Sequence, residues 1–413
     1  MRILFLCHRL PFPPKRGGKI RPFNMIRHLA RRHEVTVATL ARSAEEMAEG
    51  RGLREHCHQL HVEPISPVAA WGRFAVRGLS AQPATFGYFR SPALRRTIDG
   101  LLAQRGFDAI LVHCSSMGAY VAQHRGARKV MDFGDADSEK WLEYGRRAPF
   151  PLSLGFRLEG GKVSRAERWL GEHFDVCSVI SPRERDVLAR HVTKPIHVIP
   201  NGVDLEYFRP RRSPGIEGGR RLIFTGNMSY RPNVDAVCHL VREILPRVRQ
   251  EVPDVELYVV GMDPSPAVRR LAEPPRVVVT GRVDDVRPYF EEAAVAVAPL
   301  RVARGLQNKV LEAMAMSVPV VASPAAAAGI DAVAGRDLLV AEDPADFARA
   351  VLGLLRDSDA RRRHAAAGRA SVEDNHDWGR VLMRLEELVV GDTRAIHPRS
   401  PEPVRTGPVG GNH

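Results

Sequence analysis

Short apolar runs alternate along the chain with longer segments whose apolar residues recur at helical spacing. The first run, Arg2–Cys7, is followed by a loop rich in Pro and Gly, and helical spacing then appears over residues 19–32. Further runs typical of buried strands cover residues 34–40, 109–113, 129–133, 175–180 and 196–199. Short apolar strands that alternate with helices predict a parallel sheet covered by helices on both faces.

The same alternation begins again near Arg220. The strands predicted there are residues 221–225, 256–260, 276–280, 295–298 and 318–322. The helices predicted there include residues 233–250, 308–316, 343–356 and 359–374. The sequence therefore predicts the α/β class, with two doubly wound Rossmann-like domains that face each other across a cleft lined by the carboxyl ends of both sheets.

These two series of elements predict how the chain divides into domains. We expect an N-terminal domain at residues 1–205, which would bind the acceptor, and a C-terminal domain at residues 206–375, which would bind a nucleotide. Residues 376–391 are expected to form a last helix that returns to the N-terminal domain. Residues 392–413 are rich in Pro, Gly and Arg, a composition typical of a disordered tail.

Length and composition fit two globular domains and restrict the choice of partner only slightly. At 413 residues the chain is too long for one ordinary core, and 26% charged residues is a usual globular content. The formal net charge of +13 comes largely from arginine. Such a charge favours anionic partners, which include nucleotide phosphates, an acidic lipid leaflet and nucleic acid.

The cysteines and the hydropathy indicate a compartment. The five cysteines are scattered and never form a CxxC pair, which is typical of thiols in a reducing environment and argues against a disulfide framework or a zinc site. No stretch approaches the roughly 20 apolar residues that a membrane span needs. We therefore expect a cytoplasmic protein whose membrane contact, if it has one, is peripheral and on the cytoplasmic face.

The most specific run is PLRVARGLQNKVLEAMA at residues 299–315. It leaves a predicted strand, turns at Gly305 and opens a helix, and the free N–H groups at such a helix start suit a diphosphate. Glu312 lies about one turn into this helix, where its carboxylate can accept hydrogen bonds from the two hydroxyls of a ribose. Spacing alone leaves open the alternative that Glu312 is a plain solvated glutamate.

This run, together with the segment up to Ser323, resembles the E-x7-E region of glycosyltransferase family 4, a large family with the GT-B fold. Other segments are similar to motifs of that family and occur in the family's order. They are Gly17-Gly18, Ser181-Pro182-Arg183-Glu184, Asn201-Gly202-Val203-Asp204 with Phe208, Phe224-Thr225-Gly226-Asn227-Met228 and Gly281-Arg282. Residues 132–138 and 228–233 are also similar to a subgroup associated with PEP-CTERM/exosortase exopolysaccharide loci.

The resemblance implies a retaining hexosyltransferase that moves a sugar from a nucleotide-diphosphate donor to a lipid-linked or saccharide acceptor in exopolysaccharide biosynthesis. It implies neither a cofactor nor a bound metal. The donor-binding residues that it implies are Gly226, Asn227, Arg231, Arg282, Gly305, Leu306, Gln307, Lys309 and Glu312. The catalytic residues that it implies are His113 and Glu312, with Arg304.

Two departures from the family pattern concern the charges around the donor. The first acid of E-x7-E, which in the family contacts the transferred sugar, falls on Arg304 here. Asn227 and Asn233 stand where the family has an Arg and a Lys that hold the diphosphate. We expect Arg231, Arg304 or Lys309 to supply the missing positive charge.

His113 ends a predicted strand at the position where the family places a histidine near the transferred sugar. A neutral imidazole can donate to a sugar hydroxyl while it accepts a hydrogen bond elsewhere. The alternative is a structural histidine at a strand end.

The Gly17-Gly18 pair lets a ligand approach the backbone closely, or it simply turns the chain between strand and helix. Lys19, Arg21 and the neighbouring Lys15 and Arg16 would attract the phosphate of a donor or of a lipid-linked acceptor, unless they only face solvent. We treat Gly17, Gly18 and Lys19 as a candidate phosphate loop.

Asp135 and Asp137 form a DxD pattern, which binds a divalent metal in the GT-A transferase fold. Two doubly wound units argue against that fold, so we expect these two aspartates to face the acceptor or to cap the helix that begins near Ser138.

Other functions use the same features. An epimerase or hydrolase on the same frame would consume nucleotide sugar without an acceptor. A basic nucleic-acid-binding protein would also be positively charged, but the arginines are dispersed and aromatic RNA-binding strands are missing, so we expect no nucleic-acid partner. The basic segment 15–32 would lie on an anionic leaflet, or would show an apolar face simply because it packs on the sheet.

Overall fold

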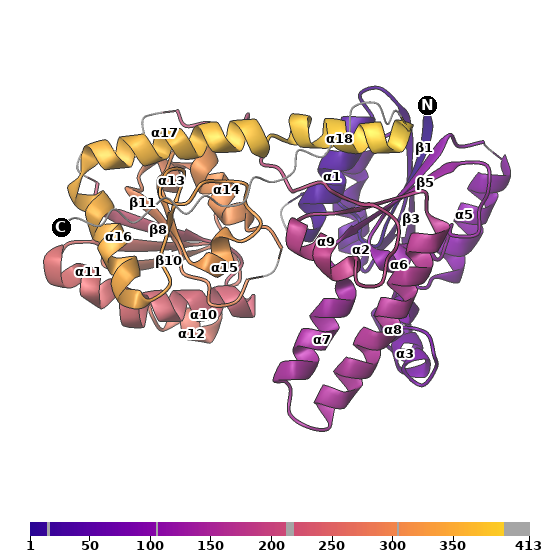
Figure 1. Ribbon diagram of the computed structural model, residues 1–413, viewed down its shortest axis with the longest axis horizontal. Helices are drawn as coiled ribbons and strands as arrows, with labels where there is room; N and C mark the ends of the chain where they lie inside the picture. The colour runs from indigo at the N-terminus through magenta and orange to yellow at the C-terminus, as the bar shows by residue number, and fades with distance from the viewer. Residues whose placement is uncertain (15–16, 105, 212–218, 304, 392–413) are drawn as a thin grey trace, which may run out of the picture.

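Two parallel β-sheets organise the chain into two domains that lie side by side (Figure 1). This computed structural model describes residues 1–14, 17–104, 106–211, 219–303 and 305–391. The N-terminal sheet runs in the order β3 (Gln59–Pro64), β2 (Glu34–Ala41), β1 (Arg2–Cys7), β4 (Ala109–His113), β5 (Arg128–Gly134), β6 (Val176–Val179) and β7 (Ile196–Val198). The C-terminal sheet runs in the order β10 (Val277–Gly281), β9 (Glu256–Val260), β8 (Arg221–Thr225), β11 (Val295–Ala298), β12 (Val320–Ala322) and β13 (Leu339–Val340).

Helices connect the strands in both domains. Those of the N-terminal domain are α1 (Gly17–Leu29), α2 (Ala44–Glu49), α3 (Pro67–Gly78), α4 (Ala84–Tyr88), α5 (Pro92–Gln104), α6 (Ser115–Gly118), α7 (Asp137–Arg147), α8 (Leu152–His173) and α9 (Pro182–Leu188), with a 3-10 turn at Gly50–His56. The C-terminal domain contains α10 (Arg231–His239), a π-helical turn at Leu240–Ile244, α11 (Leu245–Glu251), α12 (Pro266–Arg269), α13 (Arg287–Glu291), α14 (Asn308–Ala315), α15 (Pro324–Ala327), α16 (Pro344–Arg356) and α17 (Ser358–Asn375). The last described helix is α18 (Trp378–Val390).

The strands pair in parallel throughout the described residues, and this confirms the predicted fold of two doubly wound Rossmann-like domains. The central strand β1 is buried over five of its six residues, as expected for a parallel strand covered on both faces. The order in which successive strands are added to the sheet reverses between β1 and β4, which pair in parallel with Cys7 opposite His113. In turn, His113 pairs with Asp132 of β5. The register thus brings three strand ends together at the point where open α/β sheets bind ligands.

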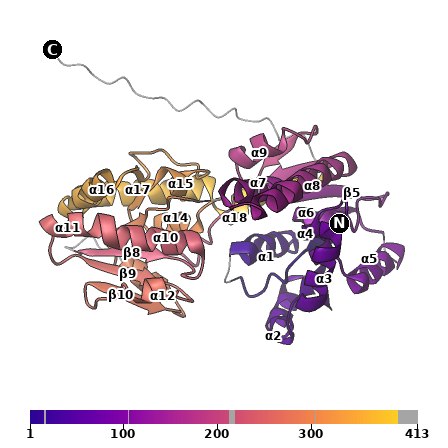
Figure 2. The ribbon, with the colours of Figure 1, turned by 90° about the horizontal axis from the view of Figure 1, so that it is seen from below.

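Helices cover both faces of the N-terminal sheet. One core contains buried side chains of α5, α6 and α8 with one face of the strands, and a second core contains those of α1 and α18 with the other face. Seen from below, α7 and α8 lie together along one side of the domain and α2 lies on the other (Figure 2).

The end of the chain packs on the N-terminal domain. Trp378, Val381 and Leu385 of α18 share a core with Ile3 and Phe5 of β1. In Figure 1, α17 runs along the C-terminal domain and α18 continues onto the N-terminal domain.

The crossing between the domains is held by short contacts to residues 201–203. The Val203 N–H donates to the carbonyl of His376 at 2.8 Å, and His376 Nδ1 lies 3.1 Å from the carbonyl of Asn201. A Cβ on Gly202 would lie 2.7 Å from the Trp378 ring, so this crossing needs a glycine.

Several elements were not expected from the sequence pattern. β3 (QLHVEP) is only half-buried and reads as polar, and β13 is two residues long. A helix was expected to begin near Ser138, where α7 lies, but its pairing with the long helix α8 was not expected. Residues 392–413, predicted to be a disordered tail, and residues 212–218 of the predicted linker lie outside the described residues.

Candidate active site

Side chains from four elements form a buried polar cluster at the carboxyl ends of β4 and β5. The guanidinium of Arg21 in α1 donates to the carboxylate of Asp132 through Nε at 3.0 Å and Nη2 at 2.7 Å. Nδ1 of His113 lies 2.7 Å from Asp132 Oδ2, and the Ser178 hydroxyl donates to Oδ1 at 2.8 Å. Arg21 also donates to the carbonyl of Pro200 at 3.1 Å. The cluster therefore fixes the orientation of His113 at the strand ends.

The charge of Asp132 decides the tautomer of His113. Burial alone would raise the pKa of Asp132, but the charge of Arg21 and the hydrogen bonds from His113 and Arg21 outweigh burial and hold this pKa well below its usual range. Because an ionised carboxylate only accepts hydrogen bonds, Nδ1 of His113 must carry the proton. A neutral His113 then offers Nε2 as an acceptor. We expected it to donate to a sugar hydroxyl, and the Asp132 contact reverses that direction.

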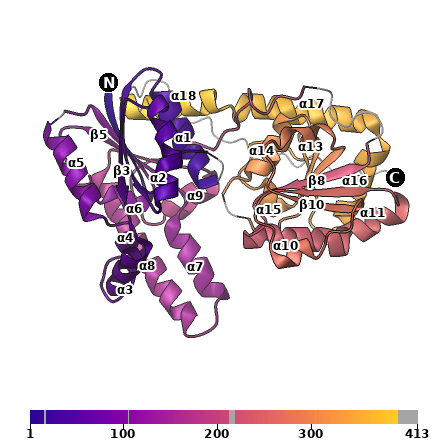
Figure 3. The same cartoon turned by 180° about the vertical axis from the view of Figure 1, so that it is seen from behind.

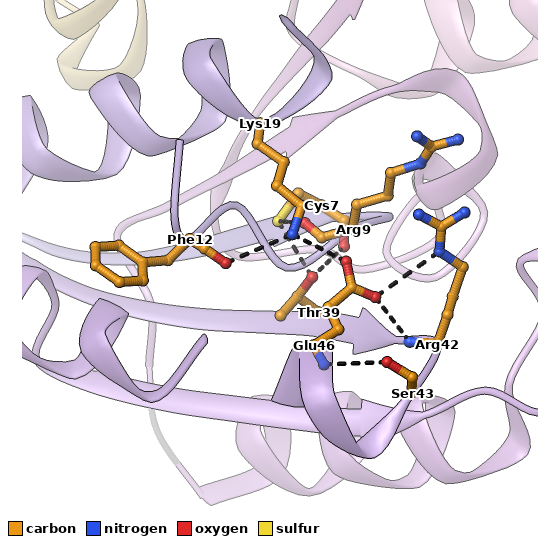
Figure 4. A network of polar contacts seen from close by, with 8 residues as sticks. All are labelled: Cys7, Arg9, Phe12, Lys19, Thr39, Arg42, Ser43 and Glu46. Atoms are coloured by element: carbon orange, nitrogen blue, oxygen red, sulfur yellow. Dashed lines mark hydrogen bonds and ion pairs between the residues drawn. The ribbon is translucent and has the colours of Figure 1, made fainter. Parts of the chain in front are cut away.

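Basic residues near Gly17 and Gly18 have partners within the protein. Arg21, expected to attract phosphate, is only 3% exposed and is bound to Asp132. Lys19, assigned to the same phosphate loop, lies with Nζ 3.0 Å from Glu46 Oε1 in α2 (Figure 4). A bound phosphate would therefore have to compete with Glu46 for Lys19.

The backbone of this loop is nevertheless open. A Cβ built on Gly18 would meet nothing within 4 Å, so a ligand can approach there. Lys15 and Arg16 lie outside the described residues.

Two arginines that we did not single out from the sequence lie close together beside Glu46 (Figure 4). The backbone N–H of Arg42 donates to Glu46 Oε2 at 2.9 Å, and the Arg42 Nε lies 3.8 Å from the same oxygen. Burial and the charge of Arg42 lower the pKa of Arg9. The Nε of Arg9 is buried and has no hydrogen-bond partner among the described residues. One carboxylate thus faces three cations, and positive charge is left over at the ends of β1 and β2.

His8 links this basic group to His113. Its ring lies 4.9 Å from the ring of Phe89 and 6.4 Å from that of His113, measured between centroids. Burial, helped by nearby positive charges, lowers the pKa of His8 well below its usual value, so the ring is neutral. The sequence signal for His8, Arg9 and Arg42 is that each lies within two residues of the end of a predicted strand.

Asp135 and Asp137 lie at the start of α7, facing the space between the domains. Asp137 accepts a hydrogen bond from the Ser115 hydroxyl at 2.7 Å. Burial and the charges of Glu184 and Asp137 raise the pKa of Asp135 to about 7, although its side chain still touches solvent. Neither aspartate caps α7, whose N-cap residue is Ala136.

The loop before α14 is the part of the C-terminal domain that meets this surface. Gly305 has a φ of +61°, and a Cβ on it would lie 3.2 Å from Asp135 Oδ1 and 3.2 Å from Ile180 Cδ1. Gly329 likewise approaches Ser181, with a built Cβ 3.5 Å from the Ser181 side chain. The turn therefore faces the N-terminal domain and lines the space between the two domains. Glycine is required at position 305 both by its backbone conformation and by the close approach.

On the C-terminal side, Lys309 lies against Asn233, one of the two asparagines at which the sequence departs from the family pattern. Its Nζ lies 2.6 Å from Asn233 Oδ1 and 4.2 Å from the centroid of the Phe224 ring. The Asn233 side chain also donates to the carbonyl of Asn227 at 2.9 Å. A Cβ on Gly226 would lie 2.7 Å from Asn233 Nδ2 and 3.2 Å from Lys309 Nζ, so the β8–α10 loop must carry glycine there.

Lys309 and Glu312 lie on the same helix, and the pKa of each is shifted in the direction that favours its neutral form. Burial lowers the pKa of Lys309 to about 7, against the charge of Glu312. Burial raises the pKa of Glu312 to about 7, against the charge of Lys309. Each group is thus poised to change charge near neutral pH, as expected of a site that an ionic ligand completes.

The remaining donor-site candidates are spread around this pair. Leu306 is buried, Gln307 donates to the carbonyl of Gly305 at 3.4 Å, and Asn227 binds the Ser229 hydroxyl at 2.7 Å. Arg231 and Arg282 are exposed. Arg304 lies outside the described residues.

Tyr207 lies on the C-terminal side of the site, and the sequence analysis did not propose it as a site residue. Its hydroxyl donates to Asp285 Oδ1 at 3.3 Å, and the Arg287 guanidinium lies 4.2 Å from its ring centroid. Burial and the charges of Asp285 and, more weakly, Glu312 raise the pKa of Tyr207.

Both halves of the chain match models of sugar-transferring families. Residues 16–207 match Glycosyltransferase Family 4, and residues 219–357 match Glycosyl transferases group 1. The chain belongs to the group 1/family 4 glycosyltransferases. The subgroup suggested by residues 132–138 and 228–233 is a finer assignment than these matches give.

Curated relatives of this glycosyltransferase include mycobacterial enzymes. The phosphatidyl-myo-inositol mannosyltransferase of Mycobacterium tuberculosis (strain ATCC 25618 / H37Rv) is 33% identical over 223 residues, which are 49% of this chain and 56% of that protein. The match thus spans only about half the length of that relative. The GDP-mannose-dependent alpha-(1-6)-phosphatidylinositol monomannoside mannosyltransferase of Mycolicibacterium smegmatis is 25% identical and covers 93% of this chain and 97% of its own.

A solved structure has the same fold over nearly the whole chain. Anabaena Alr3699/HepE in complex with UDP and glucose superposes with a TM-score of 0.67 and 16% identity, covering 95% of this chain and 100% of that one.

None of the helices in the described ranges is long and apolar enough to cross a bilayer. Those ranges also contain no group of three or more His, Cys, Asp and Glu side chains arranged to hold a metal ion. Asp135 and Asp137 therefore do not belong to such a group.

Proposed function

We propose that this glycosyltransferase moves a hexosyl group from a nucleoside-diphosphate sugar to an acceptor hydroxyl, with retention of the anomeric configuration. The observation that carries the proposal is the turn at Gly305. It lies against Asp135 and leads directly into Lys309 and Glu312, with His113 at the facing strand ends. A donor between the domains would therefore meet cations, a helix start and a ribose-binding carboxylate on one side and the acceptor surface on the other.

The charges fit the leaving group. When the bond between the anomeric carbon and the diphosphate oxygen breaks, negative charge develops on the diphosphate. The N–H groups at the start of α14 and the protonated form of Lys309 lie on the side where that charge is stabilised. The acceptor oxygen then bonds to the anomeric carbon on the same face, and its proton passes to an oxygen of the leaving phosphate. Glu312, ionised, accepts hydrogen bonds from the ribose hydroxyls.

His113 is assigned to the acceptor side of the reaction centre. Its Nδ1 proton is held by Asp132, so Nε2 can accept a hydrogen bond from a hydroxyl of the transferred sugar. Asp135, with a pKa of about 7, is able to donate to or accept from the acceptor near neutral pH. Gly226, Asn227, Arg231, Arg282, Leu306 and Gln307 are proposed to complete the donor site.

For the acceptor we propose a lipid-linked molecule that carries phosphate. Arg9 and Arg42 place unneutralised positive charge at the ends of β1 and β2, beside His8 and His113. The relatives whose names mention phosphatidylinositol support the choice of a lipid acceptor. The similarity of residues 132–138 and 228–233 to exopolysaccharide-associated enzymes supports a role in exopolysaccharide assembly.

Donor binding is tested by thermal denaturation with UDP-, GDP- and ADP-sugars. A donor at about 100 times its Kd should stabilise the protein by roughly 2.7 kcal/mol. Glu312→Gln should raise the donor KM strongly, because an amide is a weaker acceptor for the ribose hydroxyls than a carboxylate. Unchanged donor kinetics in this variant would remove Glu312 from the site.

Turnover is then measured with and without a lipid-linked acceptor. Consumption of donor that needs the acceptor supports transfer. Equal consumption in its absence would instead identify a hydrolase or an epimerase.

A further inference from the structure

A cavity lies in the N-terminal domain, on the face of the sheet covered by α5, α6 and α8. It has a volume of about 750 Å³ and is bounded by α4, α5, α6, α8 and the end of α3. Its cationic lining residues are Arg77, Arg90, Arg95, Arg96, Lys162 and Arg165, and none of the described lining residues is acidic. The aromatic rings of Phe86, Tyr120 and Trp169 supply apolar walls. A cavity with this lining suits a ligand that is both anionic and apolar.

Cationic side chains of the cavity contact neutral groups of the protein, namely backbone carbonyls and an aromatic ring. Arg95 donates to the carbonyl of Ala119 at 2.9 Å and lies 4.8 Å from the centroid of the Tyr120 ring. Lys162 of α8 donates to the carbonyl of Gly78 at the end of α3 at 2.8 Å. These contacts orient the cations and leave their charge in place.

The cations also repel one another. Burial and the charge of Arg90 lower the pKa of Arg77. Arg90 and Arg96 are exposed and have no carboxylate partner among the described residues. The nearest acid to Arg95 is Asp99, at 3.7 Å in an exposed pair, and such a pair neutralises little. An anionic ligand would relieve this repulsion.

Apolar side chains gather beside the cavity. Nine of the sixteen exposed large hydrophobic residues in the described chain lie on α3 or in the α7–α8 pair. They are Val68, Trp71, Val76 and Leu79 from α3 and its end, and Tyr144, Phe150, Leu152, Leu154 and Leu158 from α7 and α8. So dense an apolar surface, concentrated in short segments, marks an interaction site.

The apolar surface leads into the cavity along one side of α8. Leu154 and Leu158 are four residues apart, and Lys162, Arg165 and Trp169 continue the same helical face to the cavity wall. Both α3 and the α7–α8 pair project from the same end of the N-terminal domain, away from its sheet (Figures 1 and 3).

We propose that this surface docks the protein on an anionic phospholipid bilayer, with α3 and the α7–α8 end inserted at the interface and lipid phosphates held in the basic cavity. A bilayer interface offers acyl chains and anionic head groups within one layer, which matches apolar side chains rimmed by arginine and lysine. Charge complementarity selects this occupant, because all six charged lining groups are cationic. The site is separate from the donor loops of the C-terminal domain.

The segment that the sequence suggested for membrane contact has another role. In α1 the apolar residues Phe23, Met25, Ile26 and Leu29 are buried in the core shared with α18. The apolar face of α1 is therefore buried inside the protein. Exposed apolar residues of this domain lie instead on α3 and α8.

The proposal is tested by sedimentation of the full chain with vesicles of phosphatidylcholine alone and with 30 mol% phosphatidylglycerol, at about 0.1 M salt, where charges are screened beyond roughly 10 Å. We expect binding at least tenfold stronger to the anionic vesicles. The double variant Arg90→Glu with Arg96→Glu should lose at least tenfold of that binding. Leu154→Ser with Leu158→Ser should lose a similar factor.

The matched control changes the same charge elsewhere. Arg363→Glu with Arg384→Glu alters exposed arginines of α17 and α18, along the opposite edge of the molecule in Figure 1. It should keep binding within twofold. Equal losses in the control and in the cavity variant would overturn the proposal, because binding would then follow net charge alone.

Two further readouts separate the remaining outcomes. Thermal stabilisation by the nucleotide donor should be unchanged in every variant, and this shows that the variants fold and that donor binding does not depend on this surface. Sedimentation velocity should find the same mass for wild type and for Leu154→Ser with Leu158→Ser. A larger wild-type mass that the serine variant abolishes would assign the apolar surface to a second copy of the chain and overturn the bilayer assignment.

Discussion

The facing sides of the two domains hold their charges in different ways. On the N-terminal side, Asp132 is buried with Arg21 and His113, and every group is matched by a partner from another element. On the C-terminal side, Lys309 and Glu312 are half-buried without comparable compensation, and the pKa of each lies near 7. The first arrangement fixes a geometry before any ligand arrives. The second is completed by the ligand, so stability and binding should respond oppositely to mutation on the two sides.

The largest expected effect is the removal of Asp132. Asp132→Leu leaves the guanidinium of Arg21 buried and unpaired, which should lower the free energy of unfolding by about 3–5 kcal/mol. The double variant Arg21→Met with Asp132→Leu removes both charges and should recover much of that loss. Urea unfolding monitored by fluorescence measures both. If the double variant is as unstable as the single one, the ion pair is not the source of the loss.

Lys309 should show the opposite behaviour. Lys309→Met removes a cation that is disfavoured by burial, so the free energy of unfolding should stay level or rise. Affinity for a nucleoside diphosphate should fall by roughly 10- to 100-fold, equivalent to about 1.4–2.8 kcal/mol. Calorimetric titration with the nucleotide measures the affinity. An unchanged Kd would show that the diphosphate is held by other groups.

Proton uptake on binding sharpens the same contrast. With a pKa of about 7, Lys309 is mostly neutral at pH 8, and a bound diphosphate should raise that pKa and draw in a proton. Titrations in buffers of different ionisation enthalpy should therefore show more proton uptake in wild type than in Lys309→Met. Arg384→Gln serves as a control, because Arg384 is exposed on α18 and arginine does not titrate in this range.

The pH dependence of stability should separate Glu312 from Asp132. Folding raises the pKa of Glu312 from 4.5 to about 7. Between these values the folded state holds a proton that the unfolded state has released. The contribution of Glu312 to the free energy of unfolding is therefore lost as the pH rises through 7. Relative to wild type, Glu312→Gln should gain stability from pH 5 to pH 8. The pKa of Asp132 is depressed, and its contribution is lost as pH falls below the usual aspartate range. A constant difference between Glu312→Gln and wild type would contradict the buried environment of Glu312.

The smallest effect is expected at Arg231, which is exposed at the start of α10. Arg231→Ala should change the free energy of unfolding by less than about 0.5 kcal/mol. If Arg231 contributes to donor binding only as a distant charge, the variant should lose a few-fold in affinity at low salt and nothing at high salt.

The sequence pattern was informative where strands are apolar on both faces. β1, β4, β8, β9 and β11 were predicted with the bounds that the structure gives, because a buried parallel strand is an unbroken apolar run. β3 was missed because an edge strand buries little and carries polar residues on its open side. The projecting α7–α8 hairpin was not predicted from the sequence. Some of its apolar residues are buried in the domain core and others are exposed, so they do not form a single apolar stripe.

The candidate site divides in a similar way. Gly305, Lys309 and Glu312 share one short stretch of chain, so local order and the family likeness were enough to single them out. Arg21 and Asp132 are 111 positions apart, and Arg9 and Arg42 follow different strands. No local pattern indicates that such residues meet.

By itself, then, the sequence determined the α/β class, the repeated order of strands and helices, and the loop before α14. These follow from side-chain periodicity and from glycine at a turn, which act over a few residues. Only the tertiary structure decided that Asp132 fixes the tautomer of His113, that Lys309 reaches Asn233, and that the apolar residues of α3 and α8 remain exposed beside a basic cavity. Those facts depend on which distant segments pack together, since burial and electrostatic pairing are properties of the folded contacts.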